Sequence, residues 1–270
     1  MAGDIRALAA GGCHLGRLPH CGFPGPTVWS FIWKPFVTVG GTGFTKPELL
    51  VVIAAVLVAG FFWAAFGNPQ VVPKKVQLLG EIAIEFVRDQ ILRPMMGKNG
   101  DRYLPFLISL FFFIWVMNLM EIIPLAQFPV TSRIAFPVTL MIMVYVTYTY
   151  LGIKNFGLIG YFKNMVPAGA PLFILPILAP VEIAQYIVVR PFTLAIRLFA
   201  NMFAGHILLL VFTLATWYMF SVGIGILYGA TSFLLVIALT GFEMFIQALQ
   251  AFIFTILTAQ YIGGSLEAGH

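Results

Sequence analysis

Two long apolar runs, residues 171–220 and 224–262, constrain the possible folds more than any other feature of this sequence. A straight helix of roughly forty residues is about 60 Å long, twice the ~30 Å of hydrocarbon in a bilayer. These segments must therefore be strongly tilted, bent or divided. Pro176, Pro180 and Pro191 supply bend points in the first run.

The composition indicates that a lipid bilayer surrounds most of the chain. Of its 270 residues, 60% are hydrophobic and 9% are charged, and the mean hydropathy is +0.97. A soluble domain of this size needs much less apolar surface. The net charge of +5 comes from scattered basic residues, and no run of them suggests a nucleic-acid partner. We expect an all-α polytopic membrane protein.

Five apolar segments are predicted to cross the bilayer, the last two as a long, tilted antiparallel hairpin. They are residues 49–66, 103–124, 134–153, 171–220 and 224–262. Residues 76–93 have apolar positions at helical spacing, but other faces carry Glu81, Glu85, Arg88 and Asp89. This segment is predicted to be an amphipathic interfacial helix. Residues 48–270 are expected to form a single membrane domain.

Residues 1–47 are rich in glycine and proline and are predicted to form an extramembrane arm. The arm contains Cys13-His14 and the mirrored His20-Cys21. These four side chains could bind zinc, although their spacing matches no usual finger. A disulfide between the cysteines is possible if the arm faces an oxidising compartment. We favour unpaired thiols and assign no metal site.

The distribution of basic residues predicts the orientation of the chain. The loop between the first two spans carries Lys74, Lys75, Arg88, Arg93, Lys98 and Arg102, and Lys154 and Lys163 follow the third span. Only Arg133 lies between the second and third spans. The positive-inside rule then places the N-terminus outside and the C-terminus in the cytoplasm.

Arg197 places a guanidinium within an apolar run, where insertion costs at least ~3 kcal/mol, so it calls for a counter-charge, a wet cavity or a function. At about 100° per residue, one polar or small face collects Arg190, Thr193, Arg197, Asn201 and Ala204. Such a face lets another helix approach closely. No acidic partner for Arg197 is evident in the chain, so we expect one on another protein. Alternatively, Arg190 snorkels to a headgroup and Arg197 only ties the bundle together.

The last two segments also contain groups that can handle protons. Glu243, Gln247 and Gln250 lie within about 60° of one another on a helix and form a polar stripe. In a hairpin that turns near residue 223, His206 and Glu243 reach nearly equal depth. An imidazole exchanges protons near neutral pH, so this pair could relay protons. Alternatively, the two side chains only satisfy each other's hydrogen bonds.

Three other polar residues receive weaker interpretations. Glu121 lies near the end of the second span, where we expect a solvated or locally paired carboxylate. Neither Glu121 nor Asn118 is given a role. Glu182, on the far side of Pro191 from Arg197, could line a second wet path.

Two motifs resemble a known family. They are RLFANMFAGH at residues 197–206 and LQAFIF at residues 249–254. In their order and in their spacing to the C-terminus they resemble subunit a of the F-type ATP synthases, the static proton-channel subunit beside the rotating c-ring. The resemblance is strong over roughly residues 170–262 and weak before residue 70.

The resemblance implies a role for each matching residue. Arg197 matches the essential arginine that faces the rotor carboxylates and separates two aqueous half-channels. His206 and Glu243 match the acid and histidine pair of the inlet. Asn201 and Gln250 match polar residues close to the arginine. Glu182 approximately matches an acid of the outlet channel.

The resemblance also implies partners and a location. The partners are the c-ring, the b-type subunits of the peripheral stalk and the rest of the synthase, in a bacterial plasma membrane. Protons would enter from outside and leave towards the cytoplasm. The ATP chemistry lies on other subunits, so we expect no ATP site and no cofactor on this chain.

Two other classes of membrane protein compete with this interpretation. An independent secondary transporter or channel would show inverted repeats with matched broken helices, and the sequence shows neither. A haem-binding anchor needs two histidines on facing helices, whereas only His206 lies in a predicted span.

Overall fold

The computed structural model describes residues 37–39, 42–123, 126–164, 175–219 and 224–266. Within these ranges, five helical segments are long and apolar enough to cross a membrane. This confirms the predicted all-α polytopic membrane fold. Cys13, His14, His20 and Cys21 lie outside the described residues, so every interpretation of this group stays a prediction.

A short β-hairpin precedes the first helix, within the segment predicted as an arm. Strand β1 (Val37–Val39) pairs antiparallel with β2 (Thr42–Phe44). Helix α2 (Lys46–Phe66) follows, and the Glu48 carboxylate accepts a hydrogen bond from the backbone N–H of Thr45. This contact satisfies a backbone donor at the helix start, and the first span therefore begins before residue 49.

The predicted interfacial segment is helical and packs against α2. It consists of α3 (Lys75–Val87), the π-turn η2 (Arg88–Leu92) and α4 (Arg93–Met96). A Cβ atom added at Gly80 would lie 2.9 Å from the Cβ of Ala65, so glycine permits this close approach. The location of the segment at the bilayer interface stays a prediction.

The remaining helices follow in chain order. They are η3 (Gly97–Tyr103), α5 (Leu104–Leu119), η4 (Val130–Ser132), α6 (Ala135–Asn164), α7 (Leu175–Ala184), the π-turn η5 (Gln185–Val189), α8 (Arg190–Met219) and α9 (Ile224–Leu266). The second span ends earlier than predicted. The third is longer and bends at Gly157, whose φ is 70°. The predicted fourth span is divided into α7, η5 and α8.

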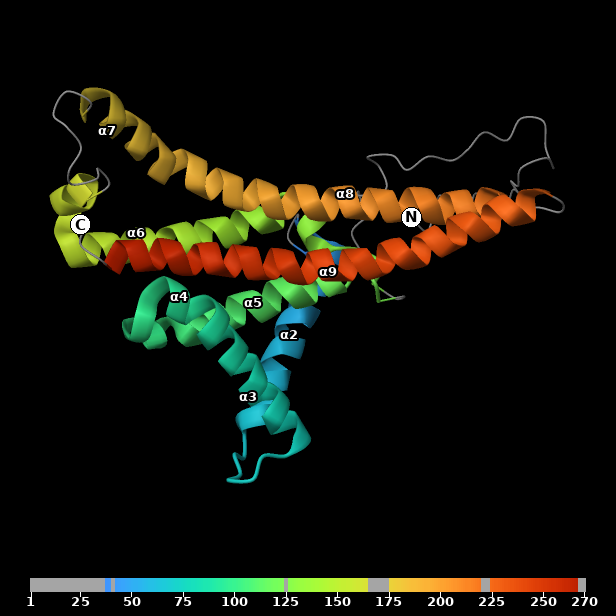
Figure 1. Ribbon diagram of the computed structural model, residues 1–270, viewed down its shortest axis with the longest axis horizontal. Coiled ribbons are helices and arrows are strands. Elements are labelled where there is room, and N and C mark those ends of the chain that lie inside the picture. Colours follow the sequence, from blue (N-terminus) through green and yellow to red (C-terminus); the bar gives the residue numbers. More distant parts are fainter. Residues whose placement is uncertain (1–36, 40–41, 124–125, 165–174, 220–223, 267–270) are drawn as a thin grey trace.

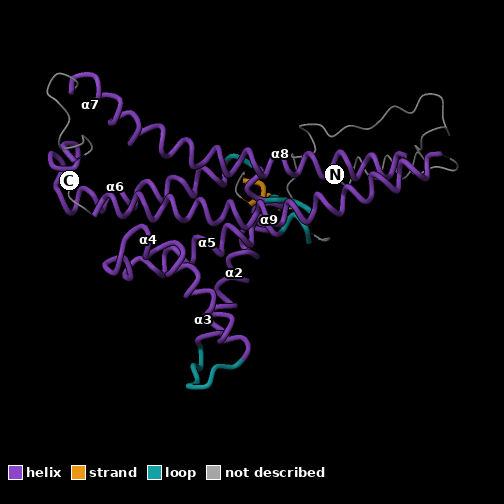
Figure 2. The backbone as a smooth tube through the Cα atoms, in the orientation of Figure 1, coloured by secondary structure: helices purple, strands orange, loops and turns teal. Residues whose placement is uncertain are grey.

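Helices α8 and α9 form the predicted hairpin. They lie side by side in Figure 1 and make the most extensive contact between any two described elements, and α6 packs against both. Helices α2 and α3 lead away from this layer (Figure 1). Figure 2 shows that helices account for most of the described backbone and that strands occur only in the hairpin before α2.

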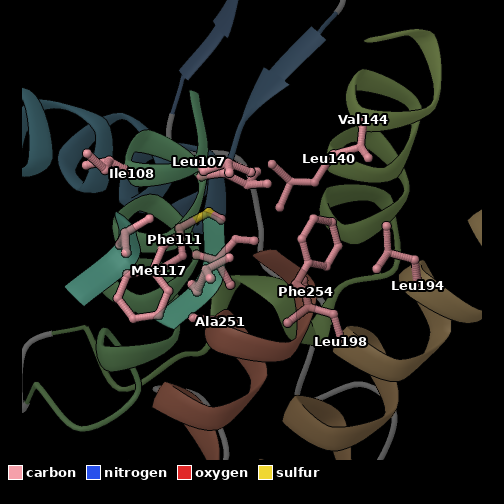
Figure 3. Close-up of a cluster of buried hydrophobic side chains, with 14 of the residues drawn as sticks. Leu107, Ile108, Phe111, Met117, Leu140, Val144, Leu194, Leu198, Ala251 and Phe254 are labelled. Atoms are coloured by element: carbon pink, nitrogen blue, oxygen red, sulfur yellow. The ribbon is translucent and has the colours of Figure 1, made fainter. Parts of the chain in front are cut away.

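The core lies where α5, α6, α8 and α9 meet (Figure 3). Its buried side chains include Leu107, Phe111, Leu140, Val144, Leu194, Leu198, Ala251 and Phe254. Outside this core, large apolar side chains such as Trp63 and Phe245 are exposed. Lipid or another membrane helix can cover such surfaces, so the membrane protein does not need to bury them itself.

Candidate functional site

A buried carboxylate joins three distant parts of the chain. Glu121, in the turn after α5, places Oε1 2.9 Å from Nδ1 of His206 on α8. Its Oε2 accepts a hydrogen bond of 2.9 Å from the amide nitrogen of Gln247 on α9. The exposed fractions of the three residues are only 7%, 5% and 0%, respectively. One acid therefore connects the α5–η4 turn to both helices of the hairpin.

This arrangement corrects the expectation for Glu121 and adds a contact of His206 that was not expected. The sequence suggested Glu243 as the partner of His206 and a solvated or locally paired Glu121. In the structure His206 contacts Glu121, which is buried and paired far along the chain. Neighbouring residues on a helix point about 100° apart, so His206 faces the turn after α5 while Gly205 faces Glu243.

Glu243 lies beside this cluster and packs against Gly205. A Cβ atom added at Gly205 would collide with both carboxylate oxygens of Glu243, so any larger residue would force the carboxylate to move. Glu243 is 5% exposed, and its Oε1 has no hydrogen-bond partner among the described residues. Glu243 is also within electrostatic range of Glu121. Two acids and an imidazole thus share one buried region.

More polar groups extend the buried cluster towards η4. The hydroxyl of Thr131 donates a hydrogen bond to the side-chain oxygen of Asn118, and both residues are fully buried. The side-chain nitrogen of Asn118 and the side-chain oxygen of Gln247 have no hydrogen-bond partner in the described part of the chain. Buried polar atoms normally bind protein or water, so water can bind at these two atoms.

The face of α8 that carries Arg197 is not covered by the described chain. Thr193, Arg197, Ala200 and Ala204 are exposed, whereas Leu198, which follows Arg197, is buried in the core. Among the described residues, Arg197 forms no ion pair and no hydrogen bond. The predicted face of small and polar residues is therefore available to a partner.

Arg190, on the same helix, is held by aromatic rings. Its guanidinium carbon lies 3.4 Å from the ring centre of Tyr186 and 5.4 Å from that of Tyr261. The hydroxyl of Tyr148 donates a hydrogen bond of 3.3 Å to the carbonyl of Tyr186. Tyr261 is also within electrostatic range of Arg197. Tyr186 of η5 and Tyr261 of α9 thus hold this second arginine, and sequence reasoning missed both contacts.

Comparison with known proteins decides the family. A family model described as ATP synthase A chain matches residues 49–263. This chain belongs to that family.

Individual ATP synthase subunits a agree with the family match. The subunit a of Streptomyces lividans is 46% identical over 262 residues, which cover 96% of this chain and 92% of that protein. The subunit a of Frankia alni is 47% identical over 254 residues, covering 92% and 88%. For that of Rhodospirillum rubrum, the identity is 37% over 244 residues, covering 89% and 98%. The similarity therefore extends over most of the length of this chain and of each of these relatives.

The other residues predicted from the family motifs are Gln250, Asn201 and Glu182, and they lie on three different helices. Gln250 is buried on α9, and Asn201 is half-buried on α8. Glu182 is half-buried on α7, and the π-turn η5 separates it from Arg197. In the described ranges, these three side chains form no hydrogen bond and no ion pair, and no group of acids, histidines and cysteines could hold a metal. The structure brings His206, Gln247 and Glu243 into one cluster but leaves Glu182 apart.

Sequence reasoning gave Glu121 no role in this ATP synthase A chain, although the sequence contained one signal for it. Glu121 follows Asn118 at a spacing that places both near the same helix end. A charge near a span end is usually solvated, so its position gave no reason to bury it. The turn after α5 brings Glu121 back against α8, which the helix pattern of a single segment cannot show.

Proposed function

We propose that this chain is the static proton-channel subunit of an F-type ATP synthase. It forms two aqueous half-channels against a c-ring, so that proton flow turns the ring and drives ATP synthesis on other subunits. The observation that carries this proposal is the exposed guanidinium of Arg197 on a membrane helix, without an acidic partner in the described chain. Such a charge needs a counter-charge, which the c-ring carboxylates supply.

Arg197 acts through its permanent charge. A guanidinium stays protonated at any accessible pH, so it does not carry the translocated proton. A rotor carboxylate that comes next to Arg197 is stabilised in its ionised form and releases its proton. The charge therefore prevents protons from passing directly between the half-channels, and each proton must travel around with the ring.

The inlet path runs through the buried cluster. His206 can exchange protons near neutral pH, and it contacts Glu121 directly. Glu243 and the amide of Gln247 lie beside them, and their unpartnered oxygens can bind water. Asn201 and Gln250 continue the polar lining towards Arg197. We include Glu121 in this path because of its contacts, and we assign Glu182 to the outlet.

The location and partners follow from the same proposal. The chain resides in a bacterial plasma membrane with its N-terminus outside and its C-terminus in the cytoplasm, and the charges of its loops support this orientation. Its exposed α8 face meets the c-ring. The b-type subunits of the peripheral stalk hold it still while the ring turns.

Replacing Arg197 tests the proposal directly. Arg197→Ala should lower proton-driven ATP synthesis in membrane vesicles at least about 100-fold, because the rotor carboxylates lose the charge that makes them release protons. The intact complex should still assemble. Arg133→Ala is the control, since Arg133 lies after η4 and contacts Thr45 at 3.4 Å. Near-normal synthesis in the Arg197 variant would contradict the proposed role.

An independent secondary transporter is the alternative function. Gentle purification from native membranes distinguishes the two, because a synthase subunit should co-purify with a c-ring and peripheral-stalk subunits. A chain that is isolated alone and transports ions after reconstitution would support the transporter.

A further inference from the structure

An apolar groove lies away from the proton path, between α2, α3 and α5. Its volume is about 780 Å³, within the range of about 300–1,000 Å³ that small-molecule sites occupy. Apolar side chains from two membrane helices line most of it, among them Ala55, Ala59 and Phe62 of α2 and Ile108 and Phe113 of α5. The groove thus has the size and lining of a site for a hydrocarbon chain.

One cation interrupts this apolar lining. Arg88, at the start of the π-turn that follows α3, belongs to the wall of the groove. Its Nε atom is buried and has no hydrogen-bond partner in the described part of the chain. The adjacent acid, Asp89, instead pairs with Arg93 at 2.9 Å. Arg88 therefore has an unused donor beside a space that apolar groups surround.

We propose that the groove binds an anionic phospholipid of the cytoplasmic leaflet, with its phosphate on Arg88 and an acyl chain between α2 and α5. A guanidinium is well suited to bind phosphate oxygens, and the chain would cover apolar side chains. The groove is lined by the end of α2 and the start of α5, which the predicted orientation places on the cytoplasmic side. Anionic lipids are concentrated in that leaflet.

The contacts favour a lipid over a membrane helix from another protein. A helix would have to bring an acid to the unused donor of Arg88. It would also have to fit its side chains between the rings of Phe62 and Phe113, which belong to the lining of the groove. A phospholipid supplies the anion and a flexible apolar chain in one molecule. The site is separate from the Glu121 cluster, so the proposal does not depend on the proton path.

Native mass spectrometry of the purified complex tests the binding. The complex is incubated with equal amounts of phosphatidylglycerol and phosphatidylcholine, and the lipid retained on this chain is measured. The wild-type chain should prefer phosphatidylglycerol, and Arg88→Gln should reduce that preference about fivefold to tenfold. Lys75→Gln is the matched control, since Lys75 is an exposed cation of α3 outside the groove. Equal retention of both lipids by the wild type, or equal effects of the two variants, would overturn the proposal.

Two further measurements separate the acyl chain from the phosphate and from a protein partner. Ala59→Phe should reduce phosphatidylglycerol retention while Arg88 is intact, because the ring fills the groove, and inorganic phosphate should not displace the lipid. A diazirine side chain introduced at Val58, in the wall of the groove, should form adducts with phospholipid after illumination. Adducts with a polypeptide in place of lipid would show that another subunit occupies the groove and would refute the lipid site.

Discussion

Glu121 uses its two oxygens for two different contacts, one with an imidazole and one with an amide. The contact with Gln247 holds a helix in place, whereas the contact with His206 connects two groups that can both carry a proton. A residue that only stabilises the bundle would tolerate an amide at this position. A residue of the proton path would not, because an amide does not exchange protons near neutral pH.

Glu121→Gln is therefore expected to slow passive proton flux through reconstituted, rotor-bound complexes by about tenfold or more. The shape of the side chain is kept, so the complex should assemble normally. Proton uptake by vesicles under an imposed potential measures the effect. Glu81→Gln is the control, because the Glu81 carboxylate accepts a hydrogen bond of 2.8 Å from Gln77 on α3, outside the cluster. Unchanged flux in the Glu121 variant would make this acid structural.

Gly205 controls the position of the neighbouring acid. Gly205→Ala should displace the Glu243 carboxylate, since the new Cβ would collide with its oxygens. A side-chain end can move aside, so we expect the chain to fold while proton flux falls severalfold. Gly241→Ala, on α9, has no atom within 4 Å of the added Cβ and should leave flux unchanged. Equal flux in the two variants would show that the position of Glu243 does not matter.

At the residue level, the sequence identified groups but not all of their contacts. Arg197 was recognisable because a charge in an apolar run has few explanations, and its exposed face agrees with the helical spacing. The acid that contacts His206 was not recognisable. That contact depends on the path of a turn, and helical periodicity carries no information about it.

Among the elements, the π-turn η5 directly precedes α8 and determines how the faces of that helix are rotated relative to α7. It separates α7 from α8 and carries Tyr186, whose ring covers the guanidinium of Arg190. A π-turn contains one residue more than an α-turn, so it shifts the faces of α7 relative to those of α8. This shift explains why helical spacing alone could not relate Glu182 to Arg197.

Tyr186→Leu should remove the stacking contact with Arg190 and destabilise the complex by about 0.5–2 kcal/mol. Tyr186→Phe should have a smaller effect, because the aromatic ring is kept and the hydrogen bond from Tyr148 goes to the backbone carbonyl. Thermal unfolding of the purified complex measures both variants. Equal stability of the Leu and Phe variants would show that the ring contributes little.

The spans were predictable as elements, but several of their ends were not. Lengths and apolar runs located all five, since a bilayer imposes both. The start of α2 depends on the contact between Glu48 and Thr45, and α6 continues past a bend at Gly157. Those features depend on local backbone geometry, which hydropathy does not describe.

For the whole molecule, the α8–α9 hairpin is the feature that the sequence predicted best. Two apolar runs joined by a short turn must pack against each other, and they do. The attachment of that hairpin to the rest of the bundle was less predictable. It depends partly on buried polar contacts, with Glu121 holding both helices.

Gln247→Leu tests this attachment. It should leave one oxygen of a buried carboxylate unpaired and lower the stability of the complex by about 1–3 kcal/mol. Gln260→Leu is the control on the same helix, because Gln260 is exposed. The melting temperatures of the two purified variants are compared with that of the wild type. A stability equal to that of the control would show that α9 is held by apolar packing alone.

The buried cluster draws its members from the turn after α5, from α8 and from α9, and these segments leave the ribosome in that order. Glu243 and Gln247 belong to α9, so a nascent chain does not possess the complete set of polar groups until α9 has been synthesised. Under the proposed function, the inlet for protons therefore cannot be complete before α9 is inserted beside α8.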